Sequence, residues 1–298
     1  MFTLRVMNSA IRFTRTRIAP TPSGFLHLGN AFSFALTAAL ARKTGAVILL
    51  RIDDLDAARV RQEYVQDIFD TLHFLGIPWD EGPANYEEYQ RRYSQLHRME
   101  LYGNLLQQLQ QGNQVFACTC SRSQLGSSSY PGNCKEKNIP LTAPTAAWRL
   151  HTNDHTHLAI KDIAGTLHRY TLPASMQDFV VRKKDGYPAY QLASMADDLH
   201  FGVDLVVRGE DLFPSTLAQL FLAQMLQCQQ FLHTAFYHHP LLVESDNKKL
   251  SKSAGSTSIQ YLRKQGKSRE AIYAMIGAMA GCNEPVHNWE SLGAAIGL

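Results

Sequence analysis

The segment Arg17-Ile18-Ala19-Pro20-Thr21-Pro22-Ser23-Gly24, completed by His27-Leu28-Gly29-Asn30, decides the fold of this chain. A strand is expected over 15–19, and a largely apolar helix over 29–42, with Gly45 ending it. Residues 46–52 are continuously apolar, which is typical of a strand buried on both faces. A strand, a loop, a helix and a second strand in this order predict the βαβ start of a parallel sheet.

The rest of the chain continues the α/β pattern, with an interruption in the middle. Between 118 and 171, short strand-like pieces and polar turns replace long helices, which indicates an inserted module. We therefore expect a Rossmann-type parallel sheet, an inserted module and a short helical C-terminal part. The further expected helices are 60–75, 88–111, 214–228 and 268–280, and the further expected strands are 205–207 and 240–243. The expected boundaries are 12–84 for the first half of the core, 85–190 for the inserted module, 191–245 for the second half of the core, and 246–298 for a lysine-containing loop with the helical C-terminal segment.

Size and composition set broad limits on function. The chain has 298 residues, of which 45% are hydrophobic and 18% charged, as is ordinary for a soluble globular protein. A formal net charge of +3 permits a nucleic-acid partner without arguing for one. No uncharged apolar stretch approaches the roughly 20 residues of a membrane span, and the N-terminus lacks the apolar core of a signal peptide. We expect a cytoplasmic protein with no membrane partner.

The start of the first helix has the features of a phosphate-binding site. A helix N-terminus offers unpaired N–H groups and the positive end of the helix dipole, which suit an anion. Gly29 allows a ligand to approach the backbone closely, and His27 and Asn30 add donors to the same anion. The alternative is a buried junction between loop and helix, in which Asn30 caps the helix and His27 has a structural partner.

A second candidate for phosphate binding is Lys248-Lys249-Leu250-Ser251-Lys252-Ser253. Lysines on both sides of a serine could hold a triphosphate and neutralise the charge that develops as pyrophosphate leaves. His238-His239-Pro240, just before this loop, could also touch the nucleotide. The alternative is a solvated basic loop.

Three of the five cysteines are clustered around one tyrosine, as Cys118-Thr119-Cys120, Tyr130 and Cys134. Three thiolates and a phenol oxygen could form a closed tetrahedral shell around zinc, and the alternative is three buried thiols. The segment that contains His151, His155 and His157 has the composition of a solvated loop, so we do not expect these histidines to bind metal.

Together and in this order, the two phosphate-binding segments resemble the two motifs of class I aminoacyl-tRNA synthetases. The longer string from Arg17 to Asn30 resembles the start of glutamyl-tRNA synthetases. The segments Arg51-Ile52-Asp53-Asp54-Leu55-Asp56, Gly76-Ile77-Pro78-Trp79-Asp80-Glu81-Gly82-Pro83, Tyr190, and Val206-Val207-Arg208-Gly209-Glu210-Asp211 follow in the order of that family.

This resemblance covers about residues 15–280 and implies an ATP-dependent enzyme that uses Mg²⁺ carried by the ATP, with glutamate and tRNA as further partners. It implies catalytic phosphate contacts from His27, Asn30 and Lys252. It implies an ATP site formed by His27, Gly29, Asn30, Lys249, Ser251 and Lys252.

The resemblance also implies the glutamate site. Arginine suits the two carboxylates of glutamate because its planar guanidinium can bind both oxygens of one group. The family has Glu where this chain has Asp53, which would hold the ammonium, and it usually has Ser where this chain has Thr21. In the alternative, acids after a buried strand only solvate a turn, and Arg208 is their ion-pair partner. The implied glutamate-binding residues are Arg17, Ala19, Thr21, Asp53, Tyr190 and Arg208.

The cysteine pattern is similar to the zinc site of glutamyl-queuosine tRNA(Asp) synthetases and of some glutamyl-tRNA synthetases. It implies a structural zinc held by Cys118, Cys120, Tyr130 and Cys134. The chain ends about 45 residues after the lysine loop, so the resemblance implies that no anticodon-binding domain follows.

The function that this resemblance implies is activation of glutamate by ATP, followed by transfer of the glutamyl group to the queuosine base of tRNA(Asp). A monomer is expected. The alternatives are a truncated glutamyl-tRNA synthetase that charges a tRNA 3′ end, a non-catalytic RNA-binding module, and a small-molecule nucleotidyltransferase. The nucleotidyltransferase fits the phosphate motifs but not a pocket formed by Arg17, Asp53 and Arg208.

Overall fold

The computed structural model describes residues 11–124, 129–242 and 258–298. The chain forms two compact units. The first unit lies within Met1–His97, Val203–Glu210 and Phe236–Leu298, and the second consists of Arg98–Gly202 and Asp211–Ala235. The division into functional domains at 12–84, 85–190, 191–245 and 246–298 stays a prediction.

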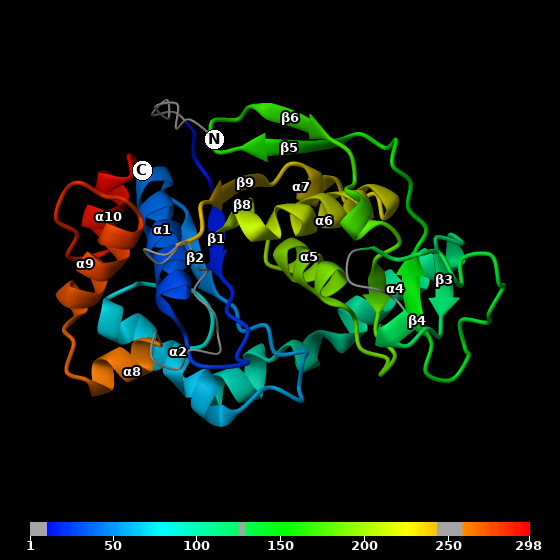
Figure 1. The fold of residues 1–298 in the computed structure, drawn as a ribbon, viewed down its shortest axis with the longest axis horizontal. Helices are drawn as coiled ribbons and strands as arrows, with labels where there is room; N and C mark the ends of the chain where they lie inside the picture. Colours follow the sequence, from blue (N-terminus) through cyan, green and yellow to red (C-terminus); the bar gives the residue numbers. More distant parts are fainter. Residues whose placement is uncertain (1–10, 125–128, 243–257) are drawn as a thin grey trace. The chain divides into compact units, whose positions relative to one another are not determined.

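The first unit begins with the βαβ arrangement that the sequence predicts (Figure 1). Strand β1 (Arg15–Ile18) pairs in parallel with β2 (Val47–Leu50), from Arg15 opposite Val47 to Ile18 opposite Leu50. Helix α1 (Leu28–Thr44) connects them and is buried along most of its length. Gly45 ends α1 in the left-handed conformation with φ = 76°, which glycine adopts without strain.

Strand β8 (Leu205–Gly209) lies beside β1 in the same unit. The Asp204 carboxylate accepts hydrogen bonds from the backbone N–H groups of Thr14 at 2.8 Å and Arg15 at 3.0 Å, which fixes the start of β8 to the start of β1. Strand β9 (Ala235–His239) is the next neighbour of β8. The predicted strand at 240–243 is wrong, because the strand ends one residue before Pro240, which has no N–H to donate to a ladder.

Helix α2 (Gln62–Leu75) is followed by a segment that runs along β2. Gly76 ends the helix with φ = 65°, as the sequence predicts. Gly82 has φ = 103°, and a Cβ atom there would lie 2.2 Å from the carbonyl oxygen of Leu50. This close approach of two backbones requires glycine.

The single helix predicted over 88–111 is wrong. A short helix, a π-helix, a 3-10 helix and a longer helix replace it. The chain turns at Ser94, which is extended with ψ = 141° and donates a hydrogen bond to Asp54 at 2.5 Å. A contact with a residue 40 positions away leaves no periodic signal in the local sequence. The four elements are α3 (Tyr86–Glu88), η1 (Tyr89–Tyr93), η2 (Gln95–Arg98) and α4 (Met99–Gln111).

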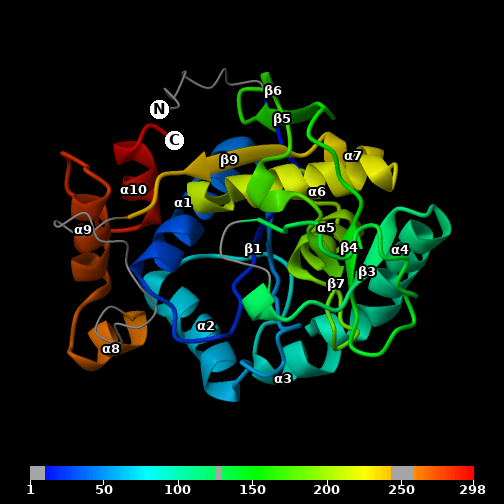
Figure 2. The same cartoon turned by 45° about the vertical axis from the view of Figure 1, so that its right-hand side comes forward.

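The described C-terminal part is helical, as expected, but it contains two helices more than the one predicted over 268–280. Besides α8 (Ile259–Lys264) and α9 (Arg269–Met279), it has α10 (Trp289–Ala295). Helix α10 packs against α1, and Figure 2 shows the two side by side. A Cβ atom on Gly293 would lie 2.6 Å from the Cβ atom of Ala39, so only glycine permits this close packing.

The second unit contains a three-stranded antiparallel sheet, a β-hairpin and several helices. Asp197 lies at the centre of its polar core and accepts hydrogen bonds from Arg98 at 2.7 Å and Tyr102 at 2.7 Å. The sheet has the order β3 (Val115–Cys118), β4 (Ala147–Leu150), β7 (Val180–Arg182), and the hairpin is β5 (Leu158–Asp162) with β6 (Leu167–Tyr170). The helices besides α4 are α5 (Tyr190–His200), α6 (Phe213–Met225) and α7 (Gln229–Leu232), and short 3-10 turns are η3 (Arg122–Gln124), η4 (Ala174–Met176) and η5 (Glu210–Leu212).

Within the described ranges, no helix combines the length and the apolar character that a membrane crossing needs.

Candidate functional site

His27 caps helix α1 and forms a reciprocal pair with Asn30. The His27 Nδ1 accepts hydrogen bonds from the N–H groups of Gly29 at 3.1 Å and Asn30 at 3.4 Å. The Asn30 Oδ1 accepts one from the N–H of His27 at 3.0 Å. The structural alternative placed the cap on Asn30, whereas the structure places it on His27. An acceptor at Nδ1 leaves the proton of a neutral imidazole on Nε2, so Nε2 can donate to a phosphate oxygen.

Gly29 makes this arrangement possible. A Cβ atom at position 29 would lie 3.1 Å from two ring atoms of His27, which is tighter than ordinary contact. The glycine that the sequence suggests for ligand approach therefore also makes room for the imidazole that caps the helix.

The lysine loop, with Lys249, Ser251 and Lys252, falls outside the described residues. The chain continues after it at Ser258, which forms an antiparallel bridge with His27. The N–H of Ile259 donates to the carbonyl of Leu26 at 2.7 Å. The chain that follows the lysine loop, from Ser258, therefore lies beside the residues that precede helix α1.

Asp53 lies next to the loop after β1 and forms a buried ion pair with Arg51. The Arg51 Nε lies 2.7 Å from Asp53 Oδ1, and Arg51 Nη2 lies 3.2 Å from Oδ2. The N–H of Asp53 donates to the carbonyl of Pro20 at 3.0 Å. The structure therefore gives this acid Arg51 as an ion-pair partner. Sequence reasoning missed Arg51, although residues i and i+2 of an extended chain lie on one face.

Asp54 has a structural role beside Asp53. It accepts hydrogen bonds from the Tyr89 hydroxyl at 2.6 Å, the Ser94 hydroxyl at 2.5 Å and the Gln95 N–H at 2.8 Å. Burial, followed by the hydrogen bond to this carboxylate, raises the pKa of Tyr89. Asp54 therefore fixes the loop after β2 to the π-helix η1, and this rigid frame positions Asp53.

Two arginines are buried on neighbouring strands of the first unit. Arg17 on β1 is 5% exposed and Arg208 on β8 is 4% exposed. The Arg17 Nη1 donates to the carbonyl of Val207 at 3.4 Å, and the Arg208 guanidinium lies 5.3 Å from the centre of the Phe236 ring. Two buried cations and a buried carboxylate, all in the first unit, suit a ligand with two carboxylates and one ammonium.

The other predicted glutamate-binding residues are distributed over both units. Thr21 is exposed and Ala19 half-buried, and both lie in the loop after β1 whose Pro20 carbonyl bonds to Asp53. Tyr190 belongs to the second unit, where it begins α5 with 42% of its surface exposed. The first unit therefore brings together Arg17, Thr21 and Asp53, with Arg208 on the strand beside β1.

His238 on β9 is a neutral neighbour of this arginine pair. Burial, together with the positive charges of Arg208 and His239, lowers the pKa of His238 to about 3. The nucleotide contact that the sequence suggests for this histidine stays a prediction.

This pKa predicts a loss of stability in acid. In the unfolded chain the pKa of His238 is the ordinary 6.5, well above its pKa of about 3 in the folded protein. The free energy of unfolding therefore has its full value above pH 6.5. It decreases as the pH falls from 6.5 toward about 3, because the unfolded chain then binds a proton that the folded protein does not. His238→Gln should make the free energy of unfolding less dependent on pH, by at most about 1.4 kcal/mol per pH unit. Urea denaturation at pH 7, 6 and 5 measures this. The exposed His155→Gln is the control, and equal slopes for wild type and His238→Gln would contradict the prediction.

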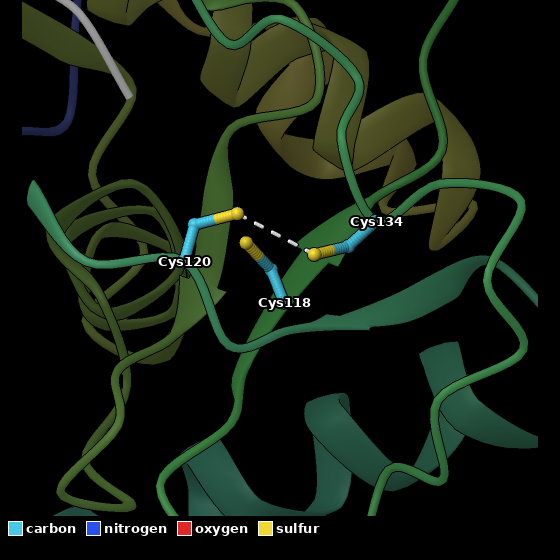
Figure 3. Close-up of side chains that lie close together, drawn as sticks. All are labelled: Cys118, Cys120 and Cys134. Carbon is cyan, nitrogen blue, oxygen red and sulfur yellow. Dashed lines mark hydrogen bonds between the residues drawn. The ribbon is translucent and has the colours of Figure 1, made fainter. Parts of the chain in front are cut away.

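The three clustered cysteines converge in the second unit. Their sulfur atoms lie within 4.8 Å of one another, and Figure 3 shows them pointing toward a common centre. Cys120 and Cys134 have their sulfurs 3.5 Å apart. Tetrahedral coordination by zinc with bonds of about 2.3 Å places sulfurs about 3.8 Å apart. The donor set fits a zinc ion, and it is the only such cluster of three metal-binding side chains in the part of the chain that the structure describes.

Tyr130 lies at the same cluster. Its hydroxyl accepts a hydrogen bond from the N–H of Cys134 at 2.8 Å, and the Arg149 guanidinium lies 3.8 Å from the centre of its ring. Burial raises the pKa of the Cys134 thiol, but hydrogen bonds from the Thr119 N–H and from the Cys120, Tyr130 and Cys118 side chains bring it down to about 7. A thiolate is therefore accessible near neutral pH, as metal binding requires.

The fold and the site together define a class I aminoacyl-tRNA synthetase catalytic domain. The family model described as "tRNA synthetases class I (E and Q), catalytic domain" matches residues 14–140 and 146–288, and the chain belongs to this family. A glutamate-tRNA synthetase from Elizabethkingia anophelis shares the fold with a TM-score of 0.73 at 21% identity, over 95% of this chain and 65% of that one.

Curated relatives carry two different names. The "Glutamyl-Q tRNA(Asp) synthetase" of Parasynechococcus marenigrum is 34% identical over 91% of this chain and 84% of its own. The protein of the same name from Symbiobacterium thermophilum is 35% identical over 89% and 86%. The "Glutamate–tRNA ligase 2" of Acidithiobacillus ferrooxidans is 34% identical over 85% of this chain. The match covers 55% of the length of that ligase.

Proposed function

We propose that this chain activates glutamate with ATP and transfers the glutamyl group to the queuosine base of tRNA(Asp). In the first step, an oxygen of the glutamate α-carboxylate attacks the α-phosphorus of ATP, the bond to pyrophosphate breaks, and glutamyl-adenylate forms. In the second, a nucleophile of the queuosine base attacks the activated carbonyl and AMP leaves. Neither step needs a covalent intermediate with the enzyme, so positioning and charge neutralisation supply the catalysis.

The observation that carries this proposal is the burial of Arg17, Arg208 and Asp53 in one unit, in a chain that matches relatives named glutamyl-Q tRNA(Asp) synthetase over most of their length. The arginines would bind the two carboxylates of glutamate, and Asp53, aligned by Arg51, would hold the ammonium. Thr21, Ala19 and Tyr190 complete the proposed set. Aspartate at position 53 is one methylene shorter than glutamate, and its ion pair with Arg51 keeps the carboxylate fixed.

The proposed ATP site is the N-terminus of α1 together with the lysine loop. The Nε2 of His27 and the amide of Asn30 would donate to phosphate oxygens, and Gly29 would admit the phosphate to the helix N-terminus. Lys249, Ser251 and Lys252 would hold the triphosphate from the other side. Bound Mg²⁺ supplies positive charge that offsets the charge developing on pyrophosphate.

The remaining proposals concern metal and location. Zinc held by Cys118, Cys120, Tyr130 and Cys134 would fix the segment between β3 and β4, a structural role with no open coordination position for substrate. We propose a cytoplasmic monomer.

The test is ATP–pyrophosphate exchange with purified protein and glutamate, aspartate or glutamine, each with and without tRNA. We expect exchange with glutamate alone and no requirement for tRNA. Labelled glutamate should then transfer to tRNA(Asp) that contains queuosine but not to a transcript that lacks it. Absence of exchange under every condition would contradict the proposal.

The second candidate is a glutamyl-tRNA synthetase that charges a tRNA 3′ end. The 34% identity to a glutamate–tRNA ligase 2 favours it. Exchange that requires tRNA, with transfer to transcripts that lack queuosine, would select this function over the first.

A further inference from the structure

The backbone of Leu26 is bound by two helices of the first unit. Its N–H donates to the Asp67 Oδ2 at 3.1 Å, and its carbonyl accepts from the N–H of Ile259 at 2.7 Å. Leu26 directly precedes His27, and Ile259 begins helix α8 just after the lysine loop. The backbone of one residue is therefore held from α2 on one side and from α8 on the other.

A buried ion pair links the same two helices. Asp67 on α2 has a side chain that is 1% exposed, and the Nη1 of Arg263 on α8 lies 3.8 Å from its Oδ1. The Nη2 of Arg263 lies 3.8 Å from Asp70 Oδ2, and its guanidinium lies 5.5 Å from the centre of the Phe74 ring. Helices α2 and α8 pack against each other in the first unit, as Figure 2 shows. Arg263 is thus held between two acids and an aromatic ring of α2.

A carboxylate at position 67 is costly to bury. Burial raises the pKa of Asp67, while the hydrogen bond from Leu26 and the charge of Arg263 act in the opposite direction. Neutral side chains could pack α2 against α8 without this desolvation cost. The ion pair instead links two parts of the first unit in a defined geometry. One oxygen of Asp67 accepts the hydrogen bond from the Leu26 N–H, and the other faces Arg263 on α8.

We infer that Asp67 and Arg263 are positioning residues for ATP, which rests on the function proposed above. They hold the start of α8 and helix α2 against the backbone of Leu26, and so fix the position of His27, the proposed phosphate contact that follows Leu26 directly. A small displacement of His27 would weaken its contact with a phosphate of ATP. The glutamate residues Arg17, Asp53 and Arg208 lie on other loops and strands, so their alignment does not depend on this link.

Asp67→Asn tests the link sharply, because asparagine keeps an oxygen for the Leu26 N–H and replaces the charged oxygen that faces Arg263 by a neutral NH2 group. We expect the KM for ATP in the exchange reaction to rise about tenfold, with the KM for glutamate changed less than about twofold. Arg263→Gln should give the same split, and the double variant should be no worse than either single variant. Asp70→Asn is the matched control, since Asp70 faces Arg263 but is 43% exposed and makes no bond to Leu26.

Each outcome decides the inference. A rise in the KM for ATP that is confined to Asp67→Asn and Arg263→Gln supports it. Equal rises in both KM values, or an Asp67→Asn variant that matches Asp70→Asn, would overturn it in favour of a purely structural pair. Thermal melts identify a variant that does not fold, and Arg263→Gln, whose side chain is 27% exposed, then decides alone. A wild-type protein without exchange would refute the proposed function instead.

Discussion

Replacing His27 by asparagine is expected to slow ATP–pyrophosphate exchange by about 10²–10³-fold, while the thermal stability stays close to that of the wild type. Asparagine is among the best residues for a helix N-cap, so its side-chain oxygen can accept from the N–H groups of Gly29 or Asn30 as His27 Nδ1 does. What it removes is the Nε2 donor. The variant therefore separates the two roles that the structure gives to one side chain.

The control for this variant is His27→Ala, which removes both the cap and the donor. It should lose activity to the same extent and also about 1 kcal/mol of stability. Lys252→Ala should likewise abolish exchange without affecting the fold. If His27→Asn exchanged pyrophosphate at nearly the wild-type rate, the imidazole would be only a helix cap and not a phosphate contact.

The beginning of the fold could be predicted from sequence because local signals determine it. Apolar runs fix α1 and β2, and glycines with positive φ at 45 and 76 end helices α1 and α2. The predictions that failed concern elements whose structure depends on contacts between residues far apart in the sequence. The break at Ser94 depends on Asp54, and the short helix α10 is stabilised by packing on α1 more than by its own seven residues.

In the candidate site, too, local sequence signals could be interpreted and contacts between distant segments could not. The spacing of Cys118, Cys120 and Cys134 correctly predicts that their sulfur atoms lie close together. Cysteines at such a spacing have few chemical roles, and zinc binding is one of them. Contacts between distant segments were missed. Arg263 belongs to a basic run that usually indicates a solvated helix flank, yet the structure pairs it with buried Asp67. Only the folded chain reveals which basic residue of such a run forms a buried ion pair.

Removing the metal should have the second large effect. We expect the purified protein to contain about one zinc per chain, and Cys134→Ser to lose it and to melt about 10 °C lower. The physical reason is that only a few small side chains hold the described part of the segment between β3 and β4 in place. A bound zinc would therefore supply much of the stability of this segment. Cys282→Ser is the control, because this half-buried cysteine lies outside the cluster. Metal analysis and thermal melts provide the measurements.

Thiol labelling checks the same prediction without a substitution. In the native protein an alkylating reagent should modify Cys282 readily and spare Cys118, Cys120 and Cys134 until a chelator removes the metal. Tyr130→Phe should lower the zinc affinity by about 10- to 100-fold, since it removes both a possible ligand and the acceptor for the Cys134 N–H. A protein without zinc, in which chelation does not change the labelling of Cys118, Cys120 and Cys134, would show that the cluster is three buried thiols. Equal zinc affinity for Tyr130→Phe and wild type would restrict the ligands to the three sulfurs, with water as the fourth.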